Sequence, residues 1–185
     1  MEPFWTSIQD SSLRQGDYLP KCLVPVFNEI TESSETIHEA LTKEYDLIIV
    51  TQSCDLENKK VQLVATCPIY LLEKFKEANS HFKESRKDFK WENYLNQVLK
   101  GRIEGLHLLA SPEAPADNQK ALLVDFREIY GLPHTYLEKR AKDIEDIGTR
   151  WRLKSPFLEH FSQAFARFFM RVGLPSSIPP FRNSG

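Results

Sequence analysis

Cysteine is scarce in this sequence and is never closely paired. The chain of 185 residues has three cysteines, Cys22, Cys54 and Cys67, and no CxxC motif. An odd and widely spaced set favours a reducing compartment such as the cytoplasm over a disulfide framework. A structural zinc site would need closely spaced ligands, so we expect neither a metal nor another cofactor.

Long apolar runs and an excess of charge are also missing. No uncharged stretch approaches the roughly eighteen residues of a membrane span, and Met1–Leu13 is polar, without the apolar centre of a signal peptide. The 24 basic and 26 acidic side chains leave a net charge of −2, which does not demand a nucleic acid partner but can conceal a local basic patch. We expect a cytoplasmic protein without a membrane partner.

The length and an apolar content of 41% suit one domain with a substantial hydrophobic core. We place this domain at residues 1–175, with a charged helical insertion at about 71–100 and a C-terminal tail at 176–185.

The domain is organised around two apolar runs, Leu47–Val50 and Val61–Ala65. Runs rich in Val and Ile between polar segments predict β-strands, and continuous rather than alternating apolarity indicates that both faces of each strand are covered. A loop held between two such strands presents its side chains rigidly. The loop contains four candidate site residues: Thr51, Gln52, Cys54 and Asp55.

The remaining elements follow from the same kinds of pattern. We predict further strands at 22–27, 106–110, 121–126 and 149–154. The first should be an edge strand or carry a bulge, because Pro20 and Pro25 cannot donate to a ladder. We expect loops at 31–42 and 111–119, a turn at Gly131–Pro133, and a polar or weakly helical link at 136–147.

Three helices are predicted. Two occupy 71–85 and 89–100, and the second ends at Gly101. The third begins with Ser155 as N-cap and Pro156 at the first helical position, ends at Gly173, and buries one aromatic face.

Five segments follow one another in an order that resembles the MazF/PemK toxin family. They are Gly16-Asp17, DLIIVTQSCDLEN at 46–58, VQLVATCPI at 61–69, ALLVDFREI at 121–129 and FSQAFARFFMRVGL at 161–174. The resemblance implies a mostly β, SH3-like barrel with helical additions, closed by a C-terminal amphipathic helix. It also implies metal-independent cleavage of single-stranded RNA in a bacterial toxin–antitoxin or defence system, an antitoxin or regulator as protein partner, and a homodimer.

The chain departs from this family at both residues that the family uses for cleavage. Those are an arginine just before the second strand and a threonine after a Pro-Ile pair. Here Lys43 lies in the arginine region, and Tyr70 follows Pro68-Ile69. Lys43 supplies a point charge without the bidentate fork of arginine, and the hydroxyl of Tyr70 stands on a longer arm. We therefore treat the expected fold and the expected RNA cleavage as two separate predictions.

Two further groups are candidates, each with two interpretations. Asp125 and Arg127 point to the same face at a strand end, where the arginine either faces a phosphate or forms an edge ion pair. Arg150, Trp151 and Arg152 combine charge with an aromatic ring, as in a surface that binds single-stranded RNA, although a solvated face explains them equally.

Three functional hypotheses follow. In the first, the chain binds or cleaves RNA on a face formed by the Thr51–Asp55 loop, Tyr70 and Arg127, with Lys43 near the phosphate. In the second, a barrel without chemistry serves as a protein-interaction or regulatory module. In the third, Cys54 is a nucleophile of a hydrolase; its candidate partners are His107, His134 and His160.

Overall fold

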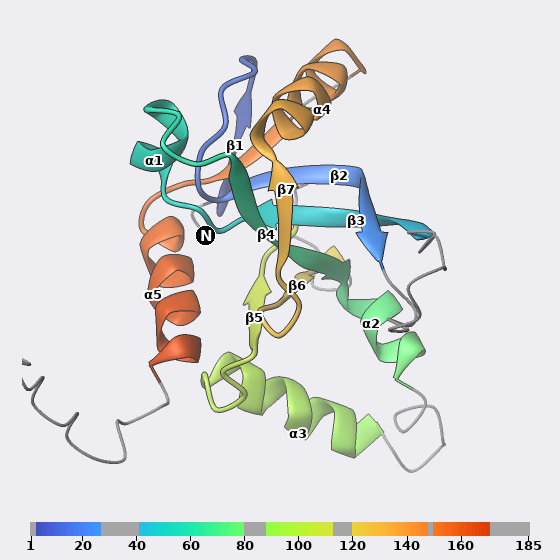
Figure 1. The fold of residues 1–185 in the computed structure, drawn as a ribbon. Coiled ribbons are helices and arrows are strands. Elements are labelled where there is room, and N and C mark those ends of the chain that lie inside the picture. The colour runs from blue at the N-terminus through green and yellow to red at the C-terminus, as the bar shows by residue number, and fades with distance from the viewer. Residues whose placement is uncertain (1–2, 27–40, 80–87, 113–119, 148–149, 171–185) are drawn as a thin grey trace, which may run out of the picture.

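A computed structural model describes residues 3–26, 41–79, 88–112, 120–147 and 150–170. These residues form one antiparallel sheet of eight strands and five helices (Figure 1). The strands are β1 (Trp5–Ile8), β2 (Asp17–Val26), β3 (Leu41–Ile49), β4 (Leu63–Leu71), β5 (Leu106–Leu109), β6 (Leu122–Asp125), β7 (Tyr130–Pro133) and β8 (Arg150–Leu153). The helices are α1 (Ser53–Glu57), α2 (Leu72–Ala78), α3 (Asp88–Leu99), α4 (His134–Ile147) and α5 (Phe157–Phe169).

The strand order is β1-β8-β2-β3-β4-β6-β5, and β7 pairs with β4 beside β6. The two predicted central strands are confirmed as β3 and β4, which pair antiparallel with Ile48 opposite Cys67. With five helices around the sheet, the fold is mixed α and β rather than mostly β.

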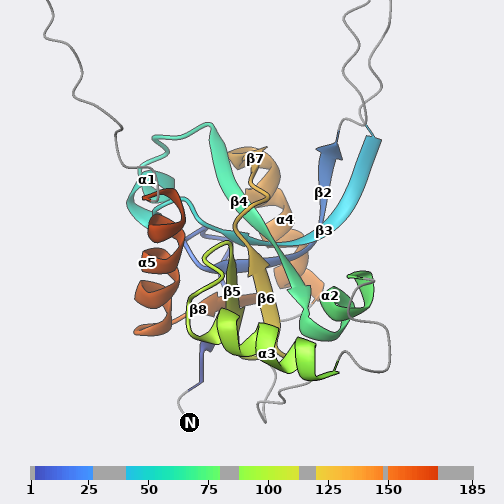
Figure 2. The same cartoon turned by 90° about the horizontal axis from the view of Figure 1, so that it is seen from below.

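The continuous apolar run in β3 is explained by cores on both faces of the sheet. Leu47 and Ile49 belong to one buried cluster together with Leu137 of α4, whereas Ile48 belongs to a second cluster together with Phe161 of α5. Figures 1 and 2 show α4 on one side of the sheet and α5 on the other. Alternate side chains of one strand therefore enter different cores.

A third cluster lies beneath α2 and α3. Phe75 and Trp91 from these helices pack against Leu106 of β5 and Leu123 of β6. The predicted insertion therefore supplies a cover for the β5–β6 end of the sheet. Its second helix ends as predicted at Gly101, which has a φ of 65°.

The sheet is curved, and among the described strands no ladder joins its two edges, β1 and β5. A side chain does connect them, because the indole N–H of Trp5 donates to the carbonyl oxygen of Ala110 at 2.7 Å. The predicted bulge near Pro20 is present as a register shift between Leu19 and Cys22.

One predicted connection is wrong, and for a second the helical alternative is confirmed. The predicted turn at Gly131–Pro133 lies in β7, which pairs with Leu63–Thr66 of β4. The link at 136–147 is the regular helix α4, whose buried residues Leu137, Ala141 and Ile144 repeat at helical spacing and contact the first core.

Two helix starts also differ from expectation. The loop after β3 contains the short helix α1. Pro156, rather than Ser155, is the N-cap of α5, and no side chain caps that helix end. The predicted loop at 31–42 is described only at Leu41 and Thr42, which begin β3; Gly173 and the 176–185 tail lie outside the described residues. None of the described helices combines the length and apolarity required to cross a membrane.

Candidate functional site at Arg127

The candidate site is built on an irregularity between β6 and β7. Ile69 of β4 pairs with Val124, and Thr66 pairs with Tyr130, so residues 125–129 stand opposite only Cys67 and Pro68. Proline has no N–H to offer a neighbouring strand, and an interrupted ladder of this kind commonly redirects side chains. Asp125 is the last residue of β6, and the extra residues after it carry Arg127 out of the regular sheet.

Arg127 is held in place by Asp125. Its Nε donates to Asp125 Oδ1 at 2.8 Å and its Nη2 to Oδ2 at 2.5 Å, and the backbone N–H of Arg127 also donates to Oδ1 at 2.9 Å. The carboxylate is buried, with 3% of its side chain exposed, whereas 55% of the Arg127 side chain is exposed. The hydrogen bond to Asp125 raises the pKa of Arg127. A buried acid thus orients an exposed cation.

This pair lines a pocket of about 430 Å³ between the sheet and α2. Tyr70 enters it from β4, where it pairs with Leu123, two residues before Asp125. The Tyr70 ring lies 6.1 Å from that of Phe75, centroid to centroid. The other lining residues are Lys74, Ala78, Asn79 and Glu128.

One tyrosine lines the pocket, and others lie next to it. Burial raises the pKa of Tyr70, so its hydroxyl stays protonated and can donate a hydrogen bond. Next to the pocket, the Tyr130 hydroxyl donates to Glu128 Oε2 at 2.8 Å, and the Tyr130 ring lies 5.3 Å from that of Tyr45. The site can therefore offer a fixed guanidinium, a hydroxyl donor and aromatic faces to a ligand.

The Thr51–Asp55 loop does not join this pocket. The Thr51 hydroxyl oxygen accepts the backbone N–H of Ala65 at 2.8 Å, which ties the loop to the start of β4. Tyr70 is five residues further along β4, a distance of roughly 17 Å at about 3.3 Å per residue. Thr51 and Tyr70 therefore stand toward opposite ends of one strand, and the structure does not bring the proposed single face together.

Cys54 lies in α1 with an exposed side chain. Its Sγ lies 3.7 Å from Gln52 Oε1 and 3.9 Å from Asp55 Oδ1, while Asp55 Oδ1 lies 3.9 Å from Lys60 Nζ. Oxygen acceptors beside a sulfur do not stabilise a thiolate, so these contacts do not favour a nucleophile. Within the described ranges, no three His, Cys, Asp or Glu side chains are grouped so that they could hold a metal ion.

Arg150 and Arg152 serve the interior of the protein rather than an exposed surface. The Arg150 side chain is fully buried, and its Nη2 donates to the carbonyl oxygens of Asp10 and Ser12 at 2.6 and 2.5 Å. Arg152 binds the buried carboxylate of Asp17 through Nε and, at 2.9 Å, through Nη2. Contact between RNA and Arg150 is therefore sterically blocked.

The last two predicted residues lie apart from both groups. Trp151 is half-buried and lines a separate pocket of about 310 Å³ together with Tyr18 and Lys120. Lys43 is exposed on β3, in the part of that strand that pairs with Val24 of β2. Of the residues predicted to be catalytic, only Tyr70 and Arg127 thus line one pocket.

The sequence analysis missed three polar residues of this pocket, which are Lys74, Asn79 and Glu128. Lys74 is four residues after Tyr70, but the intervening change from strand to helix hides that spacing.

No protein-family model matches this chain, and neither do the curated proteins or the solved structures with which it was compared.

Proposed function

We propose that this protein binds single-stranded RNA at the Arg127 pocket and cleaves it without a metal ion. The observation that carries the proposal is the exposed guanidinium of Arg127, fixed from behind by the buried carboxylate of Asp125. A guanidinium positioned in advance suits a phosphate because little conformational freedom is lost when the phosphate binds.

The pocket residues have distinct roles in this proposal. Nε and Nη2 of Arg127 face Asp125, which leaves Nη1 for a phosphate oxygen. Lys74 adds a second positive charge on the same pocket. The half-buried ring of Tyr70 supplies a face on which a base can stack, an interaction that tolerates any base.

Cleavage uses the RNA's own 2′-hydroxyl as nucleophile. The 2′-oxygen forms a bond to the adjacent phosphorus, the bond to the 5′-oxygen breaks, and a 2′,3′-cyclic phosphate and a 5′-hydroxyl result. Glu128, the exposed carboxylate of the pocket, takes the proton from the 2′-hydroxyl, and the leaving oxygen gains one from water. Arg127 stabilises the charge that develops on the phosphorane.

The test measures binding and cleavage of a fluorescent single-stranded RNA at low salt with a chelator present. Arg127→Lys keeps a charge beside Asp125 but loses the fork, so we expect RNA affinity to fall by about tenfold or more and cleavage to fall further. Cys54→Ala should behave like the parent protein, because Cys54 lies in α1 at the other end of β4.

Three outcomes would count against this assignment. If the parent protein neither binds nor cleaves RNA at low salt, the RNA function is wrong. If Arg127→Lys retains full affinity, the site is elsewhere. If Cys54→Ala alone abolishes the activity, the cysteine hydrolase hypothesis replaces it.

We also propose that the curved sheet is a divergent SH3-like barrel of the MazF/PemK type. The Trp5–Ala110 hydrogen bond between the sheet edges and the packing of α5 on the second core support this. Superposition of an experimental structure on known barrels of this type tests the proposal, and failure to align β2, β3, β4 and β8 in the same order would refute it.

The biological setting stays part of the same proposal. By resemblance we place the protein in the bacterial cytoplasm as a homodimeric toxin with an antitoxin or regulator as its partner. Light scattering on the purified protein tests the dimer, and a monomer at micromolar concentration would contradict it. If RNA binding fails while a neighbouring gene product co-purifies in a defined complex, the interaction-module hypothesis is favoured instead.

A further inference from the structure

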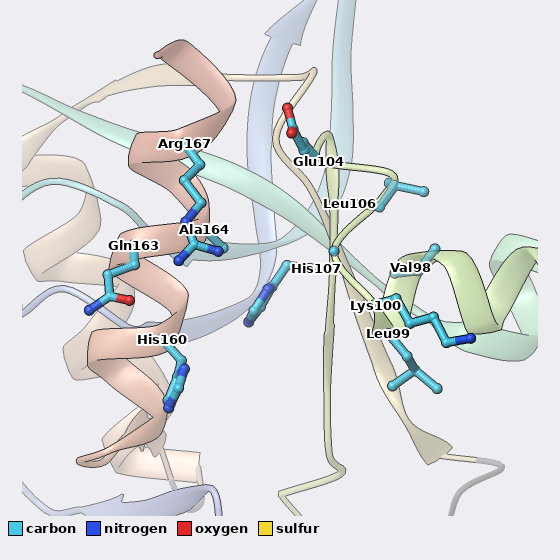
Figure 3. A pocket seen from close by; sticks show the side chains of 11 residues that line it. Val98, Leu99, Lys100, Glu104, Leu106, His107, His160, Gln163, Ala164 and Arg167 are labelled. Carbon is cyan, nitrogen blue, oxygen red and sulfur yellow. The ribbon is translucent and has the colours of Figure 1, made fainter. Parts of the chain in front are cut away.

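A third pocket lies between the C-terminal end of α3, β5 and the exposed face of α5 (Figure 3). Its volume is about 260 Å³. Six of its lining residues carry polar or charged side chains: Lys100, Glu104, His107, His160, Gln163 and Arg167. The proposed RNA contact does not use any of them.

His107 forms the wall of this pocket on β5. It pairs with Val124 of β6, and its ring stacks on Phe126 at 6.0 Å and meets Phe161 edge-on at 5.8 Å. Burial, and to a smaller extent the electrostatic interaction with His160, lowers the pKa of His107 to about 4. His107 is therefore neutral at pH 7 and can offer one N–H to an acceptor.

The opposite wall is one face of α5. His160, Ala164 and Arg167 follow at positions i, i+4 and i+7, so they lie above one another on the helix. The small Ala164 leaves room between the imidazole and the guanidinium. In Figure 3 the guanidinium of Arg167 extends toward His107, whereas the ammonium of Lys100 points away from it.

Charge and shape favour an anion. Two permanent cations, Lys100 and Arg167, line the pocket against a single carboxylate, Glu104. The nearby end of α3 does not present a row of bare carbonyl oxygens, because the N–H groups of Gly101 and Arg102 donate to Val98 and Gln97 at 2.9 Å each. Apolar surface on the α3 side can cover the uncharged part of a ligand.

We propose that the pocket between α3, β5 and α5 binds a phosphate group, with Arg167 as the charged contact and His107 and His160 as further hydrogen-bond donors. The phosphate can be free or can belong to a nucleotide or an RNA chain. This pocket shares no lining residue with the Arg127 pocket, so the proposal does not depend on RNA cleavage.

Titration of the full chain with inorganic phosphate, followed by the NMR signals of the imidazole and backbone groups, tests this site. Phosphate should shift the His107 and Arg167 signals in a saturable way and raise the pKa of His107 above its value of about 4. A nucleoside 5′-monophosphate and a single-stranded RNA are titrated in parallel. Among inorganic phosphate, the nucleotide and the RNA, the compound that binds tightest identifies the physiological ligand class.

Variants locate the contact. Arg167→Ala should weaken phosphate binding at least roughly tenfold, and Arg167→Lys by less, since loss of a charge-assisted hydrogen bond has an effect of this size. His107→Phe keeps an aromatic ring between Phe126 and Phe161 and should weaken binding about fivefold. Lys142→Ala, which removes an exposed cation from α4, should leave inorganic phosphate binding unchanged.

The proposal is overturned if phosphate leaves the His107 signals unmoved, or if Arg167→Ala binds it as the parent does. Equal weakening by Lys142→Ala would show a non-specific charge effect and would overturn it as well. Phosphate binding that persists when RNA cleavage is absent would support this site while refuting the proposed function.

Discussion

Replacement of Asp17 by alanine should destabilise the protein severely. Asp17 Oδ2 accepts the backbone N–H of Arg14 at 3.0 Å and lies 3.3 Å from Nη1 of the fully buried Arg150, and Arg152 binds both oxygens. Burial raises the pKa of Asp17, and the two arginines oppose that shift. Without the carboxylate, the buried guanidinium of Arg150 loses this ion pair and keeps the carbonyl oxygens of Asp10 and Ser12 and the exposed carboxylate of Asp10.

The expected loss follows from that burial. Removal of one partner of a buried ion pair costs about 3–5 kcal/mol, which is a large share of the roughly 5–15 kcal/mol that stabilises a typical domain. For a chain of this length, the corresponding fall in Tm is about 8–13 °C. Urea unfolding followed by circular dichroism gives the free energy, and calorimetry gives Tm.

Asp10 is the matched control, because it faces the same arginine from the surface. Its Oδ1 lies 3.6 Å from Arg150 Nη2, but 62% of its side chain is exposed. Asp10→Ala should therefore cost less than about 1 kcal/mol. A loss below 1 kcal/mol for Asp17→Ala, or equal losses for the two variants, would refute the reasoning that burial decides the effect.

Three further predictions concern single residues. Burial raises the pKa of the Cys22 and Cys67 thiols to about 12, so both stay protonated and unreactive at pH 8 in the native protein. Iodoacetamide should therefore modify only Cys54 in the native protein and all three cysteines after unfolding, as counted by mass spectrometry. His107 takes up its proton only near pH 4 in the folded state, whereas it does so near pH 6.5 in the unfolded chain. The free energy of unfolding should therefore fall as the pH is lowered from about 6.5 to about 4. Urea midpoints should show a larger fall for the parent protein than for His107→Phe. Gly101→Ala forces an alanine to a φ of 65° and should lower the free energy of unfolding by about 1–2 kcal/mol in urea titrations.

Each of these has a contrary result. Modification of Cys67 in the native protein would show that its side chain is accessible. Parallel pH profiles for the parent and His107→Phe would show that His107 does not titrate differently on folding. A Gly101→Ala variant as stable as the parent would show that the end of α3 adapts without strain.

Local patterns predicted several elements correctly because their causes are local. The Val- and Ile-rich runs formed β3 and β4, and Gly101 ended α3 because glycine reaches a positive φ without strain. The turn residues at Gly131–Pro133 misled for the opposite reason. Pairing with Leu63–Thr66, more than sixty residues away in the chain, outweighed their local preference.

The candidate site was only partly predictable. The sequence placed Asp125 and Arg127 on one face of a strand end, which left a phosphate contact and an ion pair as alternatives, and the structure shows the ion pair. It could not show that Arg150 is buried, because an arginine beside a tryptophan has the same pattern whether it faces RNA or the interior.

By itself, the sequence determined where β3, β4, α3 and α5 form, because propensity and periodicity act between near neighbours. Only the tertiary structure decided which side chains meet. Tyr70 and Arg127 line one pocket because β6 pairs with Ile69–Leu71 of β4 and the irregular segment follows directly after β6. His107 lies opposite Arg167 because α5 packs against β5 and β6. Such meetings depend on strand register and packing between distant segments, which no local pattern encodes.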